Sequence, residues 1–408
     1  MHTQLRSLLG DSRLPRLIPH RPRRVAYAVG QDDSMSEYCL HGGDVYHVIG
    51  DDFRHLDRIP DTLAADVLDA WYPPSPRVLH CLREHLPWAS RTSPPLRGQG
   101  LQRVIANTFG IPAEQVVLGH GSSDLIFRLL PEIFRHDGPV VIPAPSYGEY
   151  AHVLQRLCGA RVRYFPTYDT DFRIDPVALV RALEAWGAGG FVLVNPCNPT
   201  GQYLSAADVR FILEAIDTRI PCLIDETYFA YMPEHDGSMQ AAVAQHPNLV
   251  ILRSLSKVYA LSGLRVGYAL VSSARAQALQ ERTPPYTVST LAQMAAIEAL
   301  GDPAYALQMV QATHERRAHL REQLRGIPGL RVVESHINSL LLDLADCPID
   351  AAELVRRLAA EGILLRDISS QGDQYPGRFV RLSVLDYPTH TRIVDRLRVH
   401  LAPRVSAR

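Results

Sequence analysis

The sequence predicts an α/β protein: a large domain with a mostly parallel sheet flanked by helices, followed by a smaller α+β lobe. Short apolar runs alternate with amphipathic helical patterns from about residue 95 to residue 300, as in repeated strand–helix–strand units. Small and polar residues follow the ends of several of these apolar runs, which is where ligands bind in open α/β sheets. Short strand patterns mixed with helices continue after residue 300 and predict the lobe.

Length and composition favour small-molecule chemistry. A chain of 408 residues is long enough for a large domain with an additional lobe. The hydrophobic share of 46% and the charged share of 21% are those of an ordinary globular protein. A net charge of -1 gives no electrostatic reason to expect a nucleic acid or an anionic membrane as partner.

The cysteines and the apolar runs indicate a cytoplasmic protein. The six cysteines form no Cys-x-x-Cys pair and lie in no His cluster with metal-ligand spacing, so we expect reduced thiols and no metal site. The N-terminus has no apolar signal core, and no apolar run approaches the ~20 residues that cross a bilayer. A cytoplasmic location is therefore the expectation.

The N-terminal region divides into two expected segments. Residues 1–45 show little periodicity and are predicted to form an irregular extension. Residues 46–90 are predicted to pack with the small lobe. They carry a short helical pattern at 63–68 and, after a proline-stiffened stretch, a helix over 77–85.

The elements of the large domain, residues 91–300, follow from the apolar periodicity. Strands are expected at 115–118, 139–142, 161–165, 190–194, 221–224, 249–252 and 266–271. Helices are expected at 101–109, from 125 onward, at 176–186 and at 206–216. In the small domain, residues 301–408, the pattern predicts helices at 304–324, 351–361 and 392–401 and strands at 330–333, 339–342, 363–366 and 379–383.

Three strand ends carry candidate ligand-binding residues. Gly121, Ser122 and Ser123 lie between a strand and a helix and could offer backbone N–H groups to a phosphate, although such turns also simply cap helices. Tyr147 could stack on a flat ring or pack at the rim of a pocket. Asp225 directly follows an apolar strand, where a carboxylate without a partner is costly, and it could also cap a turn.

Lys257 is the single lysine among the 42 Lys and Arg residues. Arginine can replace lysine wherever only a charge is needed, but a guanidinium cannot condense with an aldehyde as an amine can. Ser254 and Ser256 precede the lysine and Arg265 follows it, a pattern that suits a phosphate beside an imine. A lysine on a Ser/Gly-rich surface loop is the alternative reading of the same pattern.

The order Ser-x-Ser-Lys-x-x-x-Leu-x-Gly-x-Arg-x-Gly-Tyr at 254–268 resembles a known family signature. It is similar to the lysine segment of the pyridoxal-phosphate (PLP) aminotransferases of fold type I, especially the histidinol-phosphate aminotransferase branch. The stretch Asn-Pro-Cys-Asn-Pro-Thr-Gly at 195–201 is also close to the family pattern, and the resemblance extends over about residues 65–400.

The resemblance implies PLP as cofactor and a role for each candidate. Lys257 would form the Schiff base and move the proton, and Asp225 would keep the pyridinium nitrogen protonated. Asn198 and Tyr228 would share the phenolic oxygen of the cofactor, and Tyr147 would stack on its ring. The expected phosphate-binding residues are Gly121, Ser122, Ser123, Ser254, Ser256 and Arg265. The expected ligands of the substrate carboxylate are Arg381 and Arg378, on a strand similar to the carboxylate-binding strand of the family.

Transamination of an amino acid or a phosphorylated amine, with a keto acid as amino acceptor and a homodimer as assembly, is what the resemblance implies. Thr92 stands where the family carries a tyrosine that reaches the cofactor phosphate of the partner subunit, so the substrate is expected to have diverged. A PLP decarboxylase similar to threonine-phosphate decarboxylase is the main alternative, followed by an oxidase or cyclase of specialised metabolism.

Two alternatives that involve no catalysis fit the sequence less well. A PLP-sensing regulator would need a DNA-binding domain, and the first 45 residues are too short and too proline-broken for one. A binding module without a cofactor leaves the single lysine unexplained.

Overall fold

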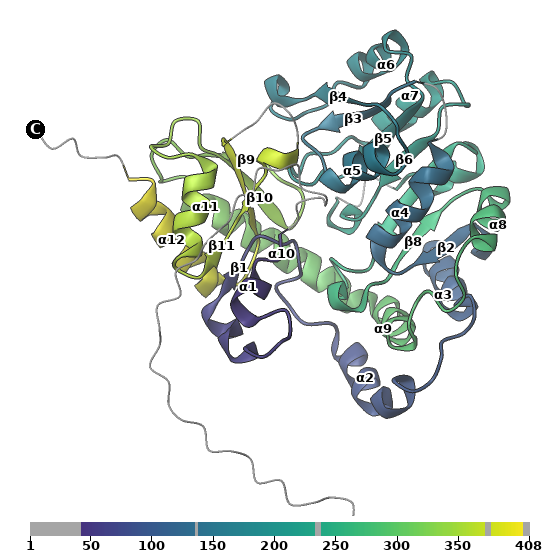
Figure 1. Cartoon of the computed structure of the whole chain (residues 1–408), viewed down its shortest axis with the longest axis horizontal. Coiled ribbons are helices and arrows are strands. Elements are labelled where there is room, and N and C mark those ends of the chain that lie inside the picture. The colour runs from purple at the N-terminus through teal and green to yellow at the C-terminus, as the bar shows by residue number, and fades with distance from the viewer. Residues whose placement is uncertain (1–41, 135–137, 233–237, 372–376, 403–408) are drawn as a thin grey trace, which may run out of the picture. The chain divides into compact units, whose positions relative to one another are not determined.

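The computed structural model describes residues 42–134, 138–232, 238–371 and 377–402 (Figure 1). The predicted irregular extension at 1–45 therefore lies outside the described residues, except for its last four. Helix α1 (Val45–Ile49) begins there.

A mostly parallel sheet forms the centre of the large domain. In the described part of the chain it has seven strands in the order β2-β8-β7-β6-β5-β3-β4. The strands are β2 (Val116–Gly119), β3 (Val140–Ala144), β4 (Val162–Pro166), β5 (Gly190–Val194), β6 (Cys222–Asp225), β7 (Leu249–Ser254) and β8 (Gly267–Leu270). Strands β4, β3, β5, β6 and β7 are parallel, whereas β8 runs antiparallel to both β7 and β2.

Helices cover both faces of this sheet, because side chains on each strand alternate between the faces. One face packs against α4 (Gly121–Ile133), α5 (Gly148–Arg156) and α8 (Ser273–Glu281). The other packs against α3 (Gln99–Phe109), α6 (Pro176–Ala185), α7 (Ala206–Ala215) and α9 (Thr290–Leu300). In β5, Val192 and Val194 point to the first face, whereas Phe191 and Leu193 point to the second.

The small lobe is an antiparallel sheet with helices beside it. Among the described residues its strand order is β12-β13-β10-β9. The strands are β9 (Arg331–Val333), β10 (Ser339–Asp343), β12 (Arg366–Asp367) and β13 (Phe379–Ser383). The helices are α10 (Pro303–Leu324), α11 (Ala351–Ala359) and α12 (Tyr387–His400), and their apolar faces share one core with the sheet.

The segment at 63–68 is extended, so the predicted helix there is wrong. It contains β1 (Leu63–Ala64), which pairs in parallel with β11 (Ile363–Leu364) of the lobe. The Ser383 amide then donates to the Ala65 carbonyl at 3.1 Å. These long-range strand partners override a helical pattern that spans only six residues. Helix α2 (Pro76–Ala89), which follows, packs instead against α9 of the large domain.

Several other elements differ from their predicted bounds. Helix α4 begins at Gly121 rather than at residue 125, so the Gly-Ser turn is itself the first turn of the helix. The single strand expected at 363–366 is two short strands, because the chain changes its pairing partner from β1 to β13 between β11 and β12. Helices α5, α8 and α9 had no counterpart in the predicted set. The described residues include no helix with the length and apolarity required to cross a bilayer.

Candidate active site

Most of the predicted site residues meet in one cavity. It has a volume of about 190 Å³ and lies beyond the carboxyl ends of the parallel strands, between the large domain and the lobe. The predicted residues that line it are Ser122, Ser123, Tyr147, Asn198, Asp225, Tyr228, Ser254, Ser256, Lys257, Arg265 and Arg381. Most of them follow strands of the large sheet, so the parallel topology gathers them at one edge, whereas Arg265 precedes the antiparallel strand β8 and Arg381 comes from β13 of the lobe.

Lys257 lies in the loop after β7, and only 17% of its side chain is exposed. Its Nζ is 3.7 Å from Oδ1 of Asp69. The pKa of the Lys257 amine is lowered to about 8, chiefly by burial; the cations Arg381 and Arg265 act in the same direction, and Asp69 opposes them. A substantial fraction of the amine is therefore neutral, and nucleophilic, slightly above neutral pH.

Asp225 ends β6 with a buried carboxylate that has two hydrogen-bond donors. The Tyr150 hydroxyl donates to its Oδ2 at 2.7 Å, and the backbone N–H of Thr227 donates to its Oδ1 at 2.8 Å. Burial raises the pKa of Asp225, whereas these two hydrogen bonds lower it. The site thus holds a buried carboxylate in a fixed orientation and facing a cavity.

The N-terminus of α4 forms an anion cradle with Arg265. Gly121 has φ of +82°, and a Cβ there would lie 2.6 Å from Nη2 of Arg265, so only glycine allows the guanidinium to approach. Arg265 itself has φ of +51°, and its Nη1 donates to the Ser262 carbonyl at 2.9 Å. Gly121 therefore lies behind the cavity wall. It makes room for the cation beside the free N–H groups of the first helical turn.

Glu149 supports two of the lining residues from behind. Its carboxylate is buried, and the Ser123 hydroxyl donates to its Oε2 at 2.9 Å. The Tyr147 phenol hydrogen-bonds with the same carboxylate. Burial, followed by the Glu149 charge, raises the pKa of Tyr147 well above its ordinary value, so this phenol is neutral and acts as a hydrogen-bond donor. Helix α5 thus fixes Tyr147 and Ser123 through Glu149 and Asp225 through Tyr150.

Arg381 connects the lobe to the large domain at the cavity. Its Nη1 donates to Oδ1 of Asn198 at 2.7 Å and its Nη2 to the Asp66 carbonyl at 2.6 Å. The buried Nε makes no hydrogen bond with any described residue. Burial lowers the pKa of Arg381 to about 10, and burial raises the pKa of Tyr228. A desolvated guanidinium with an unsatisfied N–H is suited to receive a carboxylate or a phosphate.

Arg378 and Thr92 are not brought to the cavity. The guanidinium of Arg378 instead forms a two-point pair with Asp343, with Nε 2.7 Å from Oδ1 and Nη2 2.9 Å from Oδ2. Residues two apart on a strand share one face, but Arg378 precedes β13 and is three residues from Arg381. The Thr92 hydroxyl donates to the Trp88 carbonyl at 2.8 Å and so turns back to α2.

Sequence reasoning missed five polar residues of the cavity: Asp66, Asp69, Thr227, Arg366 and Gln371. Asp66 escaped because its segment was predicted to be helical, and Asp69 stood at the start of the proline-stiffened stretch, to which no site residue was assigned. Oδ2 of Asp66 accepts the N–H groups of Gly43 at 2.5 Å and of Asp44 at 3.0 Å, which ties the N-terminal segment to the cavity wall. Arg366 comes shortly after the end of the short strand β11. Asp225 was selected because it is a polar residue at the end of a strand, and the same criterion would have selected Arg366.

The site has the parts that PLP requires. An amine with a lowered pKa can bond to an aldehyde, a buried carboxylate can pair with a ring nitrogen, and the α4 cradle with Arg265 can hold a phosphate. The glycine cradle at Gly121 and the aimed carboxylate of Asp225 are both hard to explain without such a group. Fold and site together define a PLP-dependent enzyme of fold type I.

Comparison with known proteins places the chain within that class. Residues 92–397 match the family "Aminotransferase class I and II". A histidinol-phosphate aminotransferase of Symbiobacterium thermophilum is 33% identical over 300 residues, which are 73% of this chain and 80% of that protein. The chain belongs to the class I and II aminotransferase family, and its cofactor is pyridoxal 5'-phosphate.

Solved structures confirm the fold. A histidinol-phosphate aminotransferase of Sinorhizobium meliloti, solved in complex with PLP, superposes with a TM-score of 0.79 at 22% identity, covering 92% of this chain and 98% of that one. An L-threonine-O-3-phosphate decarboxylase of Porphyromonas gingivalis superposes with a TM-score of 0.69 at 21% identity, covering 81% and 99%. Transamination and decarboxylation are therefore both found on this fold.

Proposed function

We propose that this aminotransferase acts on a phosphorylated amine or amino acid, with a keto acid as amino acceptor, through Lys257. The observation that carries the proposal is the convergence of Lys257, Asp225, Arg265 and Arg381 on one cavity of about 190 Å³. When bound, PLP supplies an aldehyde for the substrate amine and a ring that accepts electrons from the bond that breaks.

Lys257 has two roles in the proposal. Its Nζ carries the cofactor covalently, which the pKa of about 8 makes feasible near neutral pH. The same amine would act as the base that moves a proton away from the substrate carbon, because it lies in the same cavity. Asp69, 3.7 Å away, stabilises the protonated form of the amine.

Asp225, Tyr228 and Asn198 position the cofactor ring. Asp225 would pair with the ring nitrogen and keep it protonated, which requires a carboxylate that stays ionised although buried. The hydrogen bonds from Tyr150 and Thr227 supply that stabilisation. Tyr228 and Asn198 line the same cavity as Arg381. Their side chains suit hydrogen bonds to the phenolic oxygen of the cofactor.

The cavity offers two arginines to the anionic groups of the substrates. Arg381 is the proposed ligand of the carboxylate, because its buried Nε lacks a partner among the described residues. Arg366 lines the same cavity and provides a second cation. A phosphorylated substrate is supported by this pair and by the 33% identity with a histidinol-phosphate aminotransferase. Thr92, which lacks the ring of the tyrosine that the family carries at this position, supports a rim that differs from that of the branch.

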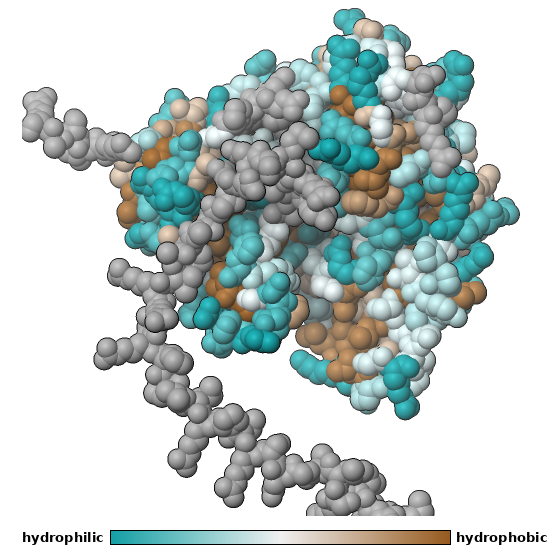
Figure 2. Space-filling view, viewed as in Figure 1, coloured by the Kyte–Doolittle hydropathy of each residue, from teal (hydrophilic) through white to brown (hydrophobic). Residues whose placement is uncertain are grey.

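A homodimer in the cytoplasm completes the proposal. Figure 2 shows apolar areas among the hydrophilic side chains of the face in view. Four large apolar residues, Leu86, Trp88, Leu96 and Tyr286, are at least half exposed, and the Tyr286 N–H donates to the Leu96 carbonyl at 3.1 Å. Such exposed groups favour an interface between copies of the chain.

The cysteines support the cytoplasmic location. The described cysteines are all free thiols, which favours a reducing compartment.

An absorbance experiment tests the function. The purified protein and Lys257→Ala are scanned between about 300 and 500 nm with PLP, before and after adding histidinol phosphate and a panel of amino acids. We expect a visible imine band in the wild type that Lys257→Ala lacks, its conversion to a shorter-wavelength band by the true substrate, and its return on addition of a keto acid.

Two outcomes would contradict the proposal. If a substrate released carbon dioxide while the visible band persisted, the enzyme would be a decarboxylase like the one from Porphyromonas gingivalis. If Lys257→Ala kept the same visible band, the covalent role of Lys257 would be refuted. Light scattering of the purified protein tests the homodimer separately, and a monomer would refute it.

A further inference from the structure

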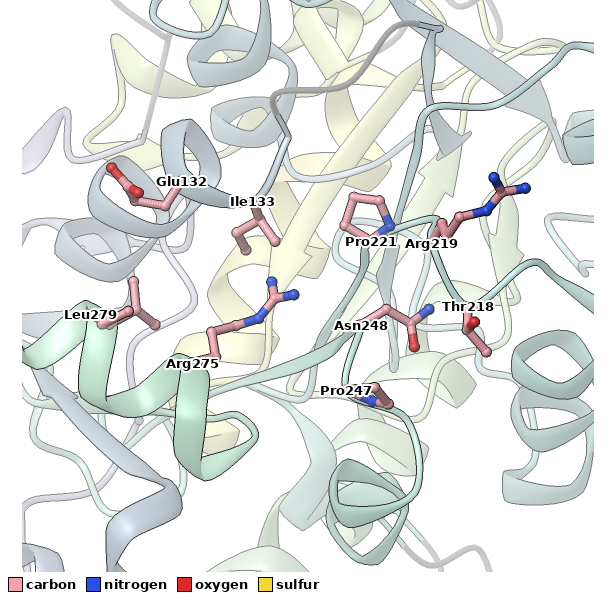
Figure 3. A pocket seen from close by; sticks show the side chains of 10 residues that line it. Glu132, Ile133, Thr218, Arg219, Pro221, Pro247, Asn248, Arg275 and Leu279 are labelled. Atoms are coloured by element: carbon pink, nitrogen blue, oxygen red, sulfur yellow. The ribbon is translucent and has the colours of Figure 1, made fainter.

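A second cavity lies at the opposite edge of the large sheet from the candidate active site. Its volume is about 420 Å³, larger than the active-site cavity and within the range of roughly 300–1,000 Å³ that small-molecule pockets occupy. The C-terminal end of α4, helix α8 and the turns that precede β6 and β7 form its walls (Figure 3). None of the residues assigned to catalysis lines it.

Apolar and polar side chains share the walls of this cavity, and two of its turns are tied to each other. Ile133, Leu279 and Pro221 supply apolar surface. The Asn248 side-chain amide donates to the Ile220 carbonyl at 2.7 Å, which ties the two turns before β6 and β7 to each other. A ligand with an apolar body would therefore meet preformed apolar surface on part of the wall.

One of the charged side chains that line the cavity has no ion-pair partner among the described residues. Glu132 pairs with Arg282, and Arg219 pairs with Asp217 at 2.5 Å. The Arg275 guanidinium forms no hydrogen bond or ion pair with any residue in the described part of the chain. Among the described side chains that line the cavity, Arg275 is therefore a positive charge without a counter-charge.

The orientation of Arg275 strengthens this conclusion. In Figure 3 its guanidinium points from α8 into the space between Ile133 and Asn248, whereas Arg219 directs its guanidinium away. Burial lowers the pKa of Arg275, yet a guanidinium remains protonated in proteins. A partly desolvated cation without a partner is unfavourable, so an anion that displaces its water gains affinity.

We propose that this cavity binds a small organic anion, with its carboxylate or phosphate group on Arg275 and an apolar body against Ile133, Leu279 and Pro221. Binding here is independent of PLP and of the substrate, because the cavity shares no residue with the active site. The fork of Arg275 suits both head groups, since both accept two parallel hydrogen bonds.

The test uses the PLP-loaded enzyme and fluorine NMR of 4-fluorobenzoate, with neutral 4-fluorobenzamide as the matched ligand. We expect the benzoate to bind and the benzamide to bind at least about tenfold more weakly, the effect of losing one charge-assisted hydrogen-bonded pair. Arg275→Gln should weaken benzoate binding by a similar factor, and Arg219→Gln, on the same rim, should change it less than about twofold. A titration with phenyl phosphate then determines which head group is preferred.

Two further variants separate loss of this anion site from misfolding and from binding in the active site. Arg275→Lys keeps the charge and should retain part of the affinity if Arg275→Gln folds poorly. Arg381→Gln removes the carboxylate ligand proposed for the active site and should leave benzoate binding unchanged. The proposal is overturned if benzoate does not bind, if Arg275→Gln binds it as tightly as the wild type, or if the affinity is lost in Arg381→Gln instead.

Discussion

At the scale of single residues, the environment of a side chain decides its chemistry. Lys257 is an ordinary amine in composition, but burial and two neighbouring arginines lower its pKa to about 8, and Asp69 limits that shift. Asp225 shows the opposite balance, because burial raises its pKa and two hydrogen bonds lower it. The lowered pKa of Lys257 and the two hydrogen bonds to Asp225 favour the protonation states that PLP chemistry needs near neutral pH, whereas the burial of Asp225 opposes its ionisation.

Labelling of the single lysine should report its pKa directly. An amine-selective reagent should modify Lys257 in the PLP-free protein with a rate that rises through pH 8 rather than through the ordinary value of 10.5. Asp69→Asn should move the midpoint to lower pH, because Asp69 stabilises the charged amine. Peptide mapping separates Lys257 from the N-terminal amine. A midpoint near 10 in the wild type would contradict the prediction.

Tyr150→Phe should shift the acid limb of the pH–activity profile. The variant loses the 2.7 Å hydrogen bond that favours ionised Asp225, so the pKa of Asp225 rises and the carboxylate is protonated at higher pH. We expect the acid limb of kcat/KM to move upward in pH and the affinity for PLP to fall by about tenfold. Tyr305→Phe, which loses an exposed hydrogen bond to Pro73, is the control and should leave the profile unchanged.

At the scale of elements, the site depends on where each helix and strand begins and ends. Helix α4 starts at Gly121, which places its free N–H groups at the cavity. Helix α5 presents Glu149 and Tyr150 from behind the cavity wall. The apolar spacing of Tyr150, Val153 and Leu154 is helical and would have revealed α5 from the sequence.

Helix α12 should make the lobe sensitive to acid. His390 is fully buried, and its Nε2 accepts the Leu385 N–H at 2.7 Å. Burial lowers the pKa of His390 to about 4, against an ordinary value of 6.5, with His319 and Arg316 acting in the same direction and Asp386 against it. The folded state thus binds fewer protons than the unfolded state between these pH values.

The free energy of unfolding should therefore fall by about 3 kcal/mol between pH 6.5 and pH 4 through His390 alone. His390→Gln keeps an acceptor for the Leu385 N–H but cannot titrate, so its unfolding free energy should depend less on pH in this window. Urea unfolding at a series of pH values measures both proteins. Parallel curves for the two would show that His390 does not carry the effect.

At the scale of the whole chain, the active-site cavity depends on close contact between the large domain and the lobe. Besides the Arg381 hydrogen bonds, the His336 N–H donates to the Gly201 carbonyl at 2.9 Å. Gly201 has φ of +72°, and a Cβ there would lie 2.8 Å from Cα of Ser335. That neighbour is backbone, so it cannot move aside as a side chain would.

Gly201→Ala should loosen this contact and raise KM for the keto acid. Gly187→Ala is the matched control, because Gly187 has φ of +57° but open space around its missing Cβ. Both variants lose about 1 kcal/mol of stability from the left-handed backbone. Only Gly201→Ala should raise KM, by displacing the segment that holds Asn198 against Arg381. An equal KM in the two variants would exclude the steric effect.

The sequence by itself determined the fold class, the succession of strands along the chain and most residues of the site. Lys257, Asp225 and Asn198 could be found because short-range patterns mark strand ends, and parallel strands bring their carboxyl ends to one edge. The family resemblance added their expected roles.

Only the tertiary structure decided which partner each polar residue takes. Arg381 reaches the cavity while Arg378 pairs with Asp343, and the segment at 63–68 is extended because it pairs with the lobe. The sequence also did not reveal that Tyr150 and Glu149 support the active-site cavity from behind. Nor did it reveal the Arg275 side chain in the separate cavity. Such contacts join residues far apart in the chain, so no local pattern in the sequence encodes them.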